Sequence, residues 1–204
     1  MAAPKRRAEG GPGAADRILA TASALFYERG IRATGVNTIA EQSGVTKVTL
    51  YAHFGSKDGL VVAHLRARNQ RWWAEFDGHL AGCATAEERL RAMFEAYRSW
   101  VLAGDFRGCG FVNASIELTA PEHPGHAIIS DHKEGIRCCL EGIATDAGCR
   151  HPAKAAEEWR LLLEGATAIA SLRHSTEPFD HARQAALRLL PTAHPGLDGG
   201  PERS

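Results

Sequence analysis

The sequence lacks any hydrophobic run long enough to cross a membrane, which excludes a transmembrane helix and predicts no membrane partner. The N-terminal stretch MAAPKRRAEGGPGAA contains basic side chains but lacks the apolar segment of a secretory signal. We therefore expect a flexible basic arm at residues 1–14. The five cysteines are an odd number, and none are spaced as CxxC, so we expect reduced thiols in a cytoplasmic protein.

Motifs of common catalytic and nucleotide-binding sites are also missing. The sequence contains no GxSxG, HExxH, GxGxxG or P-loop pattern. Acidic pairs such as Glu87 and Glu88 are adjacent, so their side chains diverge on a helix. The cysteines and histidines between His132 and His151 show no zinc-site spacing. We therefore expect no enzyme activity, no cofactor and no metal. The alternative is an enzyme or ligand carrier built on a helical body, and turnover of a ligand by the purified protein would support it.

The formal net charge is zero, which argues against nucleic-acid binding by the whole chain. The charge is unevenly distributed, however. Residues 1–57 contain eight basic and four acidic residues, so the remainder of the chain is acidic. This asymmetry indicates that the N-terminal end faces an anion.

Strand patterns are nearly absent, whereas apolar residues recur at helical spacing between Gly, Pro and Asn/Ser/Thr breaks. The pattern predicts an all-α fold of about nine helices, in which three short helices precede six others. We expect an N-terminal helix-turn-helix domain at 15–57, a helical domain at 58–191 and a disordered tail at 192–204. The expected helices span 16–29, 36–43, 46–54, 56–80, 85–103, 111–119, 125–147, 153–174 and 179–190.

The stretch VTKVTLYAHFGSKDGL, residues 45–60, alternates apolar side chains with cations and hydroxyls. Its helix KVTLYAHF follows another short helix, VNTIAEQS, and the glycine-containing turn GVT between them is typical of a helix-turn-helix. The first side chains of the second helix can reach base edges in the major groove. The next helix adds its positive N-terminus at Lys57. The residues expected to pack the helices together are Leu25, Phe26, Ala40, Val45 and Leu50.

Residues 16–65, DRILATASALFYERGIRATGVNTIAEQSGVTKVTLYAHFGSKDGLVVAHL, resemble the DNA-binding region of the TetR family of bacterial transcriptional regulators. The resemblance implies a homodimeric repressor that an unknown small-molecule effector releases from a palindromic operator in double-stranded DNA. It also implies that the C-terminal domain binds the ligand and forms the dimer.

By position, the resemblance assigns phosphate contacts to His53 and Lys57. Thr49 is also expected to contact DNA, because it faces outward near the start of the helix KVTLYAHF. Two positions depart from the family pattern, since Gly35 replaces a capping Ser or Thr and Asn37 replaces a charged residue found in some members. Contacts with bases or phosphates are assigned to Val36, Asn37, Thr46, Lys47, Val48 and Tyr51.

The C-terminal two-thirds is rich in aromatic residues at helical spacing, most of which we expect in the core. The resemblance also implies an effector pocket in this region, with apolar walls and a few polar groups. The candidate lining residues are Trp73, Phe94, Tyr97, Trp100, Phe111, Asn113, Glu117, His132 and Trp159.

The segment FRGCGFVNASIEL, residues 106–118, resembles a stretch found in one subgroup of the family. It forms a pocket entrance if Asn113 and Glu117 share one helical face. Alternatively, Cys109 is a sensor of oxidants or electrophiles, because a loop cysteine beside Arg107 and a helix N-terminus is placed to react as thiolate. We favour a third interpretation of Cys109, as a small buried hydrophobic residue, which is the common role of a free cysteine.

The expected helix at 153–174 carries two apolar stripes, which indicates two packing partners. One stripe contains Trp159, Leu163, Ala166 and the neighbours Ile169 and Ala170. A helix buried inside a monomer would show the same pattern, but a DNA reader this small needs two half-sites, which favours a homodimer. The predicted interface about a two-fold axis contains Leu161, Gly165, Ala168, Leu172, Ala182, Ala186 and Leu189.

Overall fold

The computed structural model describes residues 13–191, and within this range the chain forms nine helices and no strand, as the sequence predicts. No helix in the described range is both long and apolar enough to cross a membrane. Most of the predicted arm and the whole predicted tail lie outside this range. The helices are α1 (Ala14–Arg29), α2 (Val36–Gln42), α3 (Lys47–Phe54), α4 (Lys57–Leu80), α5 (Ala86–Ala103), α6 (Gly110–Glu117), α7 (Gly125–Asp146), α8 (Pro152–Arg173) and α9 (Glu177–Arg188).

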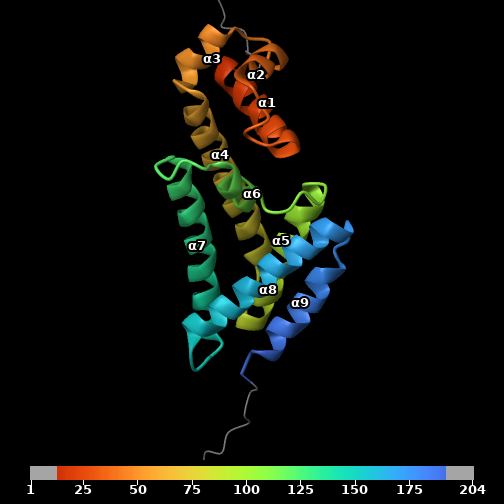
Figure 1. The fold of residues 1–204 in the computed structure, drawn as a ribbon. Coiled ribbons are helices and arrows are strands. Elements are labelled where there is room, and N and C mark those ends of the chain that lie inside the picture. Colours follow the sequence, from red (N-terminus) through yellow and green to blue (C-terminus); the bar gives the residue numbers. More distant parts are fainter. Residues whose placement is uncertain (1–12, 192–204) are drawn as a thin grey trace, which may run out of the picture.

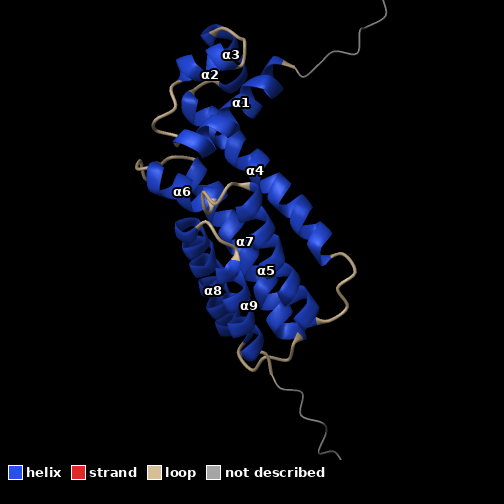
Figure 2. Cartoon of the chain, turned by 90° about the vertical axis from the view of Figure 1, so that its right-hand side faces the viewer, coloured by secondary structure: helices blue, strands red, loops and turns tan. Residues whose placement is uncertain are grey.

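The molecule is elongated, with a three-helix head of α1–α3 at one end and a helical body at the other (Figure 1). Helix α4 connects them, because its first turns pack against α1 and α3 and its later turns pack against α5 and α7. Helices α7, α8 and α9 pack in sequence along the body, as the turned view also shows (Figure 2). The head therefore sits at the end of one long lever that is embedded in the body.

Two apolar cores hold this arrangement. The body core is built around Trp72, Phe76 and Trp159, which are almost fully buried. The head core includes the predicted packing residues, and it also takes in Leu60 from α4 and Phe111 from α6. Burial of each large apolar side chain contributes roughly 1.5–3 kcal/mol. The head is thus fused by shared packing to elements of the predicted second domain.

Polar contacts join α1 and the loop after it to the body. The Ser23 hydroxyl lies 2.9 Å from His64 Nδ1, and the Phe26 ring packs edge-on against the same imidazole with 5.5 Å between ring centroids. The backbone N–H of Arg32 donates to Glu117 Oε2 at 2.8 Å. Gly30 has φ +93°, and a Cβ there would lie 2.9 Å from that carboxylate. Glycine is favoured at this position because residues with a Cβ rarely adopt this positive φ.

Burial of His64 makes folding sensitive to acid. Desolvation, aided by Arg68 and Arg71, lowers the pKa of His64 to about 4. In the unfolded chain the imidazole has its ordinary pKa of 6.5, so it takes up a proton as the pH falls below that value. In the folded protein it does so only near pH 4. Stability is unaffected by this group above pH 6.5 and declines as the pH falls toward 4.

We predict that the free energy of unfolding loses roughly 3 kcal/mol from this one histidine between pH 7.5 and pH 4. Urea unfolding of His64→Gln across that range should show a correspondingly shallower decline, because glutamine keeps a partner for Ser23 but does not titrate. The exposed His151→Gln serves as the control and should follow the wild type. Parallel pH profiles for wild type and His64→Gln would contradict the prediction.

Candidate nucleic-acid interface

Helix α3 packs on the head core through Leu50 and Phe54, and both of its ends are capped. Leu50 is completely buried in the head core. The backbone N–H of Thr49 donates to Thr46 Oγ1 at 3.1 Å, so Thr46 is the N-cap of the helix. Gly55, with φ +72°, ends the helix. These features hold α3 rigidly while leaving its outer face free.

The outer face of α3 carries the predicted reading residues at the end of the molecule farthest from the body (Figure 1). Val48 is 79% exposed and Tyr51 is 43% exposed. Thr46, Lys47 and His53 are also exposed. A helix presenting this row of side chains near its N-terminus has the form needed to enter a major groove. Thr49 is half-buried, and its hydroxyl pairs with that of Thr46 at 2.9 Å.

Helix α2 begins at Val36, with Asn37 exposed beside it. Gly35 adopts extended backbone as the N-cap and supplies no side-chain hydrogen bond. Thr34 does not replace the missing cap, because it is buried and its hydroxyl donates to Gly30 O at 2.7 Å. The first turn of α2 therefore has no side-chain cap.

Lys57 is less available than the sequence suggests. It begins α4 and is half-buried, and burial lowers its pKa against the opposing effect of Asp58 and Glu117. Ser56 caps this helix by accepting the N–H of Gly59 at 2.9 Å. A Cβ at Gly59 would lie 2.1 Å from the Phe54 carbonyl oxygen, so glycine lets α4 start directly against the end of α3.

Four of the predicted pocket residues do converge, but on a very small space. Tyr97, Trp100, Phe111 and His132 line a cavity of about 20 Å³. Such a volume holds about one water molecule. The imidazole of His132 stacks on Phe111 with 3.8 Å between ring centroids, and burial lowers the pKa of His132 to about 3. The predicted pocket is therefore not ligand-sized here.

The other predicted pocket residues lie elsewhere, which corrects the expectation of one shared site. Phe94 and Trp159 fill the body core, and the Trp159 indole N–H donates to Ala186 O at 3.1 Å. Trp73 is half-buried at the edge of that core. Asn113 and Glu117 do share a face, as the sequence predicts, but they line a separate cavity of about 290 Å³ beside the end of α1.

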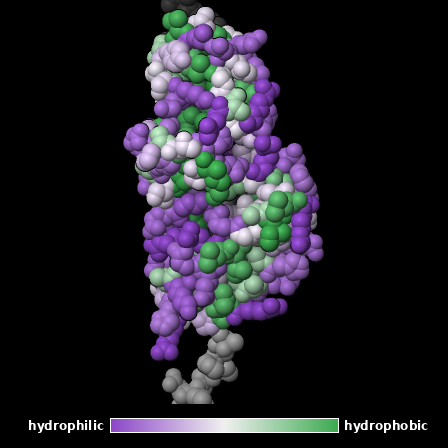
Figure 3. Space-filling view, in the orientation of Figure 1, coloured by the Kyte–Doolittle hydropathy of each residue, from purple (hydrophilic) through white to green (hydrophobic). Residues whose placement is uncertain are grey.

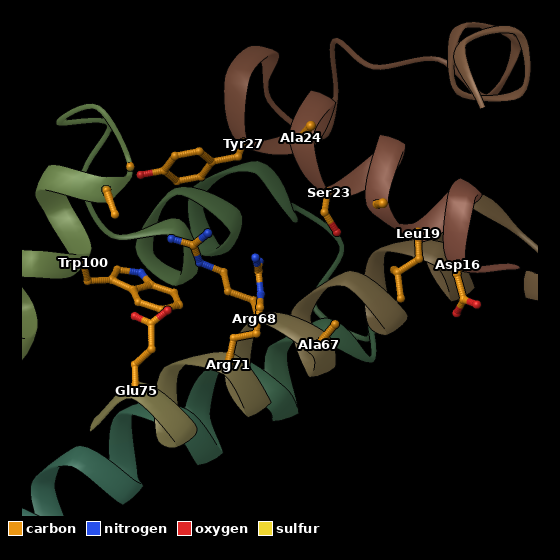
Figure 4. Close-up of a pocket in the computed structure, with 13 residues that line it drawn as sticks. Asp16, Leu19, Ser23, Ala24, Tyr27, Ala67, Arg68, Arg71, Glu75 and Trp100 are labelled. Atoms are coloured by element: carbon orange, nitrogen blue, oxygen red, sulfur yellow. The ribbon is translucent and has the colours of Figure 1, made fainter. Parts of the chain in front are cut away.

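A larger cavity, which the sequence did not predict, lies between α1, α4 and the end of α5 (Figure 4). Its volume is about 540 Å³, and its walls include Tyr27, Arg68, Arg71 and Trp100. One feature of the sequence could have indicated this cavity. Arg68 occupies a position on the inward stripe of α4, where the helical repeat otherwise places apolar residues such as Leu65.

Cys109 is half-buried at the N-cap of α6. The predicted neighbour Arg107 does not serve it, because its Nε–H donates to the Tyr27 carbonyl at 2.8 Å. Instead, Lys133 Nζ lies 3.4 Å from the sulfur and also pairs with Glu164. Burial lowers the pKa of Lys133, but Cys109 and Glu164 together outweigh this effect and raise it. The thiol therefore sits beside a charged amine.

Helix α8 has one buried and one exposed apolar face. Leu161 is 67% exposed and Leu172 is 84% exposed, with Ala168 exposed between them and Gly165 half-buried. Figure 3 shows hydrophobic surface gathered where α8 and α9 run. Ile169 belongs to the exposed face rather than to the core stripe.

The predicted contribution of α9 to this face needs correction. Ala182 and Ala186 are buried in the chain's own core, where the small side chains let α9 pack closely on α8. Leu189, the C-cap residue directly after α9, is 44% exposed and is the one predicted interface residue of this segment on the surface. The apolar face is therefore formed mainly by α8.

The chain is similar to known proteins in both parts. The family described as "Bacterial regulatory proteins, tetR family" matches residues 18–64, and "Tetracyclin repressor-like, C-terminal domain" matches residues 86–186. The crystal structure of SCO4454, a TetR-family transcriptional regulator from Streptomyces coelicolor, has a TM-score of 0.81 and 29% identity, covering 87% of this chain and 95% of that one.

Two curated relatives match over shorter lengths. The HTH-type transcriptional activator FasR of Mycolicibacterium smegmatis is 28% identical over 75% of this chain and 67% of its own length. The HTH-type transcriptional repressor KstR2 of Mycobacterium tuberculosis is 38% identical over 39% of this chain and 40% of its own length. With a helix-turn-helix head and a helical body that both match one family, the chain belongs to the TetR family and is a DNA-binding transcriptional regulator rather than an enzyme.

Proposed function

We propose that the protein is a cytoplasmic, dimeric repressor that reads a palindromic operator with α3 and is released by a small-molecule effector. The observation that carries this proposal is the outward row of Lys47, Val48 and Tyr51 on a helix anchored by the buried Leu50. Lys47 is placed to bond guanine O6 and N7, while Val48 offers an apolar contact to a thymine methyl. Tyr51 and His53 are suited to phosphate oxygens.

The direction of regulation is an inference, since FasR is named an activator and KstR2 a repressor. A dimer that occupies two half-sites covers the DNA between them, and this alone suffices to exclude other proteins. Activation requires a further contact with the transcription machinery. We therefore infer repression, which transcription in vitro from the bound DNA, with and without the protein, can test.

The contacts between head and body give an effector a physical route to the reading helix. The Tyr27 hydroxyl donates to Gly108 O at 3.3 Å, and Arg107 binds the Tyr27 carbonyl, so the end of α1 is held by the loop after α5. A ligand that changes this loop or α4 moves the head. It releases DNA only to the extent that it binds the two head positions with different affinity.

The DNA-binding assignment predicts that Lys47→Ala combined with Tyr51→Ala lowers affinity for the operator by roughly a hundredfold or more. Both side chains are exposed, so the fold should be retained. Binding to DNA from upstream of the protein's own reading frame should be measured at several salt concentrations. Lys154→Ala, an exposed lysine on α8, is the control. Specific binding by the double variant at the wild-type level would show that α3 is not the reader.

The exposed α8 face predicts that Leu161→Glu combined with Leu172→Glu converts the dimer to monomer. Two carboxylates on a two-fold interface meet their symmetry mates and must also be desolvated. Sedimentation equilibrium at micromolar protein should show the change, and operator affinity should fall with it. Leu102→Glu, which alters an exposed leucine on α5, should leave the dimer intact. A double variant that remains dimeric would place the interface elsewhere.

A second candidate switch is alkylation of Cys109, which the contact with Lys133 favours because reactive thiolates are found beside cations. With N-ethylmaleimide, the sulfur would add across the maleimide C=C bond, and the adjacent carbon would take a proton from water. The reagent should then release DNA from wild type and from Cys138→Ser, but not from Cys109→Ser. Equal release from the Cys109→Ser protein would eliminate this switch.

A further inference from the structure

Arg68 is a buried cation without an anionic partner. The side chain is only 6% exposed, and within residues 13–191 its Nε has no hydrogen-bond partner. Burial lowers the pKa of Arg68, Tyr27 and Cys109 oppose this effect, and Arg71 adds to it. A guanidinium stays protonated even when buried, and an unpaired buried charge is costly. The site is therefore electrostatically incomplete.

The guanidinium is held in place by flat surfaces rather than by charges. Its central carbon lies 4.5 Å from the centroid of the Tyr27 ring and 5.2 Å from that of Trp100. A Cβ at Gly110 would lie 2.5 Å from Nε, so the absence of a side chain there makes room for the group. The cation–π contacts and the nearby backbone of Gly110 hold the guanidinium in position, but they do not neutralise its charge.

The cavity of about 540 Å³ opens onto this guanidinium. Arg71 lines the same space, and Figure 4 shows both arginines extending from α4 toward α1, with Arg68 ending between Tyr27 and Trp100. Two acidic residues also line the cavity. Asp16 is engaged at the start of α1, where it accepts the N–H of Gly13, and Glu75 is exposed and lies beside Trp100 (Figure 4).

The rest of the wall is apolar and made of small side chains. Leu19, Ala20 and Ala24 come from α1, and Ala67 and Ala103 come from α4 and α5. A ligand that fits both parts has one anionic group for the arginines and an apolar body for the wall formed by α1. A phosphate is less well matched, because the cavity offers few donors besides the two guanidinium groups and Ser23.

We propose that this cavity is the effector site and that it binds a small organic carboxylate, with the carboxylate on Arg68 and Arg71 and the apolar body along α1. This inference rests on the proposed function, since it supplies the chemical class of the effector. Such a ligand would contact the first helix of the head and the lever helix α4 at once. Occupancy therefore sets the angle between α1 and α4, and with it the position of α3.

Titration calorimetry with octanoate, decanoate and phenylacetate, each compared with the corresponding alcohol, tests the site. At least one carboxylate should bind with a Kd below about 1 mM, and its alcohol should bind at least tenfold more weakly. Arg68→Met should weaken the carboxylate at least about tenfold and leave the alcohol unchanged. Arg66→Met, which alters an exposed arginine two residues away on a different face of α4, should behave as wild type.

Ala24→Phe gives an independent test, because it fills the cavity from an exposed position on α1 and leaves both arginines in place. It too should abolish carboxylate binding. Binding of all carboxylates equally well to Arg68→Met and Ala24→Phe, or no binding by wild type, would overturn the inference. Operator binding by the ligand-free protein is measured separately, so the inference can fail while the DNA-binding function stands.

Discussion

The packing of α1 against the start of α4 is the constraint on which the rest of the structure depends. Apolar side chains from both helices, joined by Phe111 of α6, form one continuous head core. The head therefore cannot move independently of the body. Any displacement of α3 must be accommodated by α4, by the contacts at the end of α1 and by the packing of α6 and α7 on the head core, because these hold the head on the body.

This arrangement explains why polar and charged groups gather at the boundary between head and body. His64, Arg68 and Glu117 each face α1 or the loop that follows it. We infer that an anion bound at Arg68 changes the free energy of this boundary, and it shifts the head only to the extent that it binds two head positions with different affinity.

In the body of the molecule, the two faces of α8 have different roles. Its buried face completes the body core with Trp159, and its exposed face carries Leu161 and Leu172. In the proposed dimer, a second copy covers these leucines, and removing them from water lowers the free energy. We infer that two heads joined in this way read two half-sites only at one spacing, so that a small change in head angle weakens binding.

The sequence by itself determined the helices and the helix-turn-helix. The period of apolar residues, the glycine breaks and the caps at Thr46 and Ser56 depend only on residues that are close in the sequence, so they can be recognised without the tertiary structure. The structure alone decided where side chains from distant segments meet. It placed Ala182 and Ala186 inward, separated Trp159 from Phe111, and brought Tyr27, Trp100 and Gly110 around Arg68. Those outcomes depend on how α4, α5, α6 and α9 cross, and helix periodicity specifies a buried face without naming its partner.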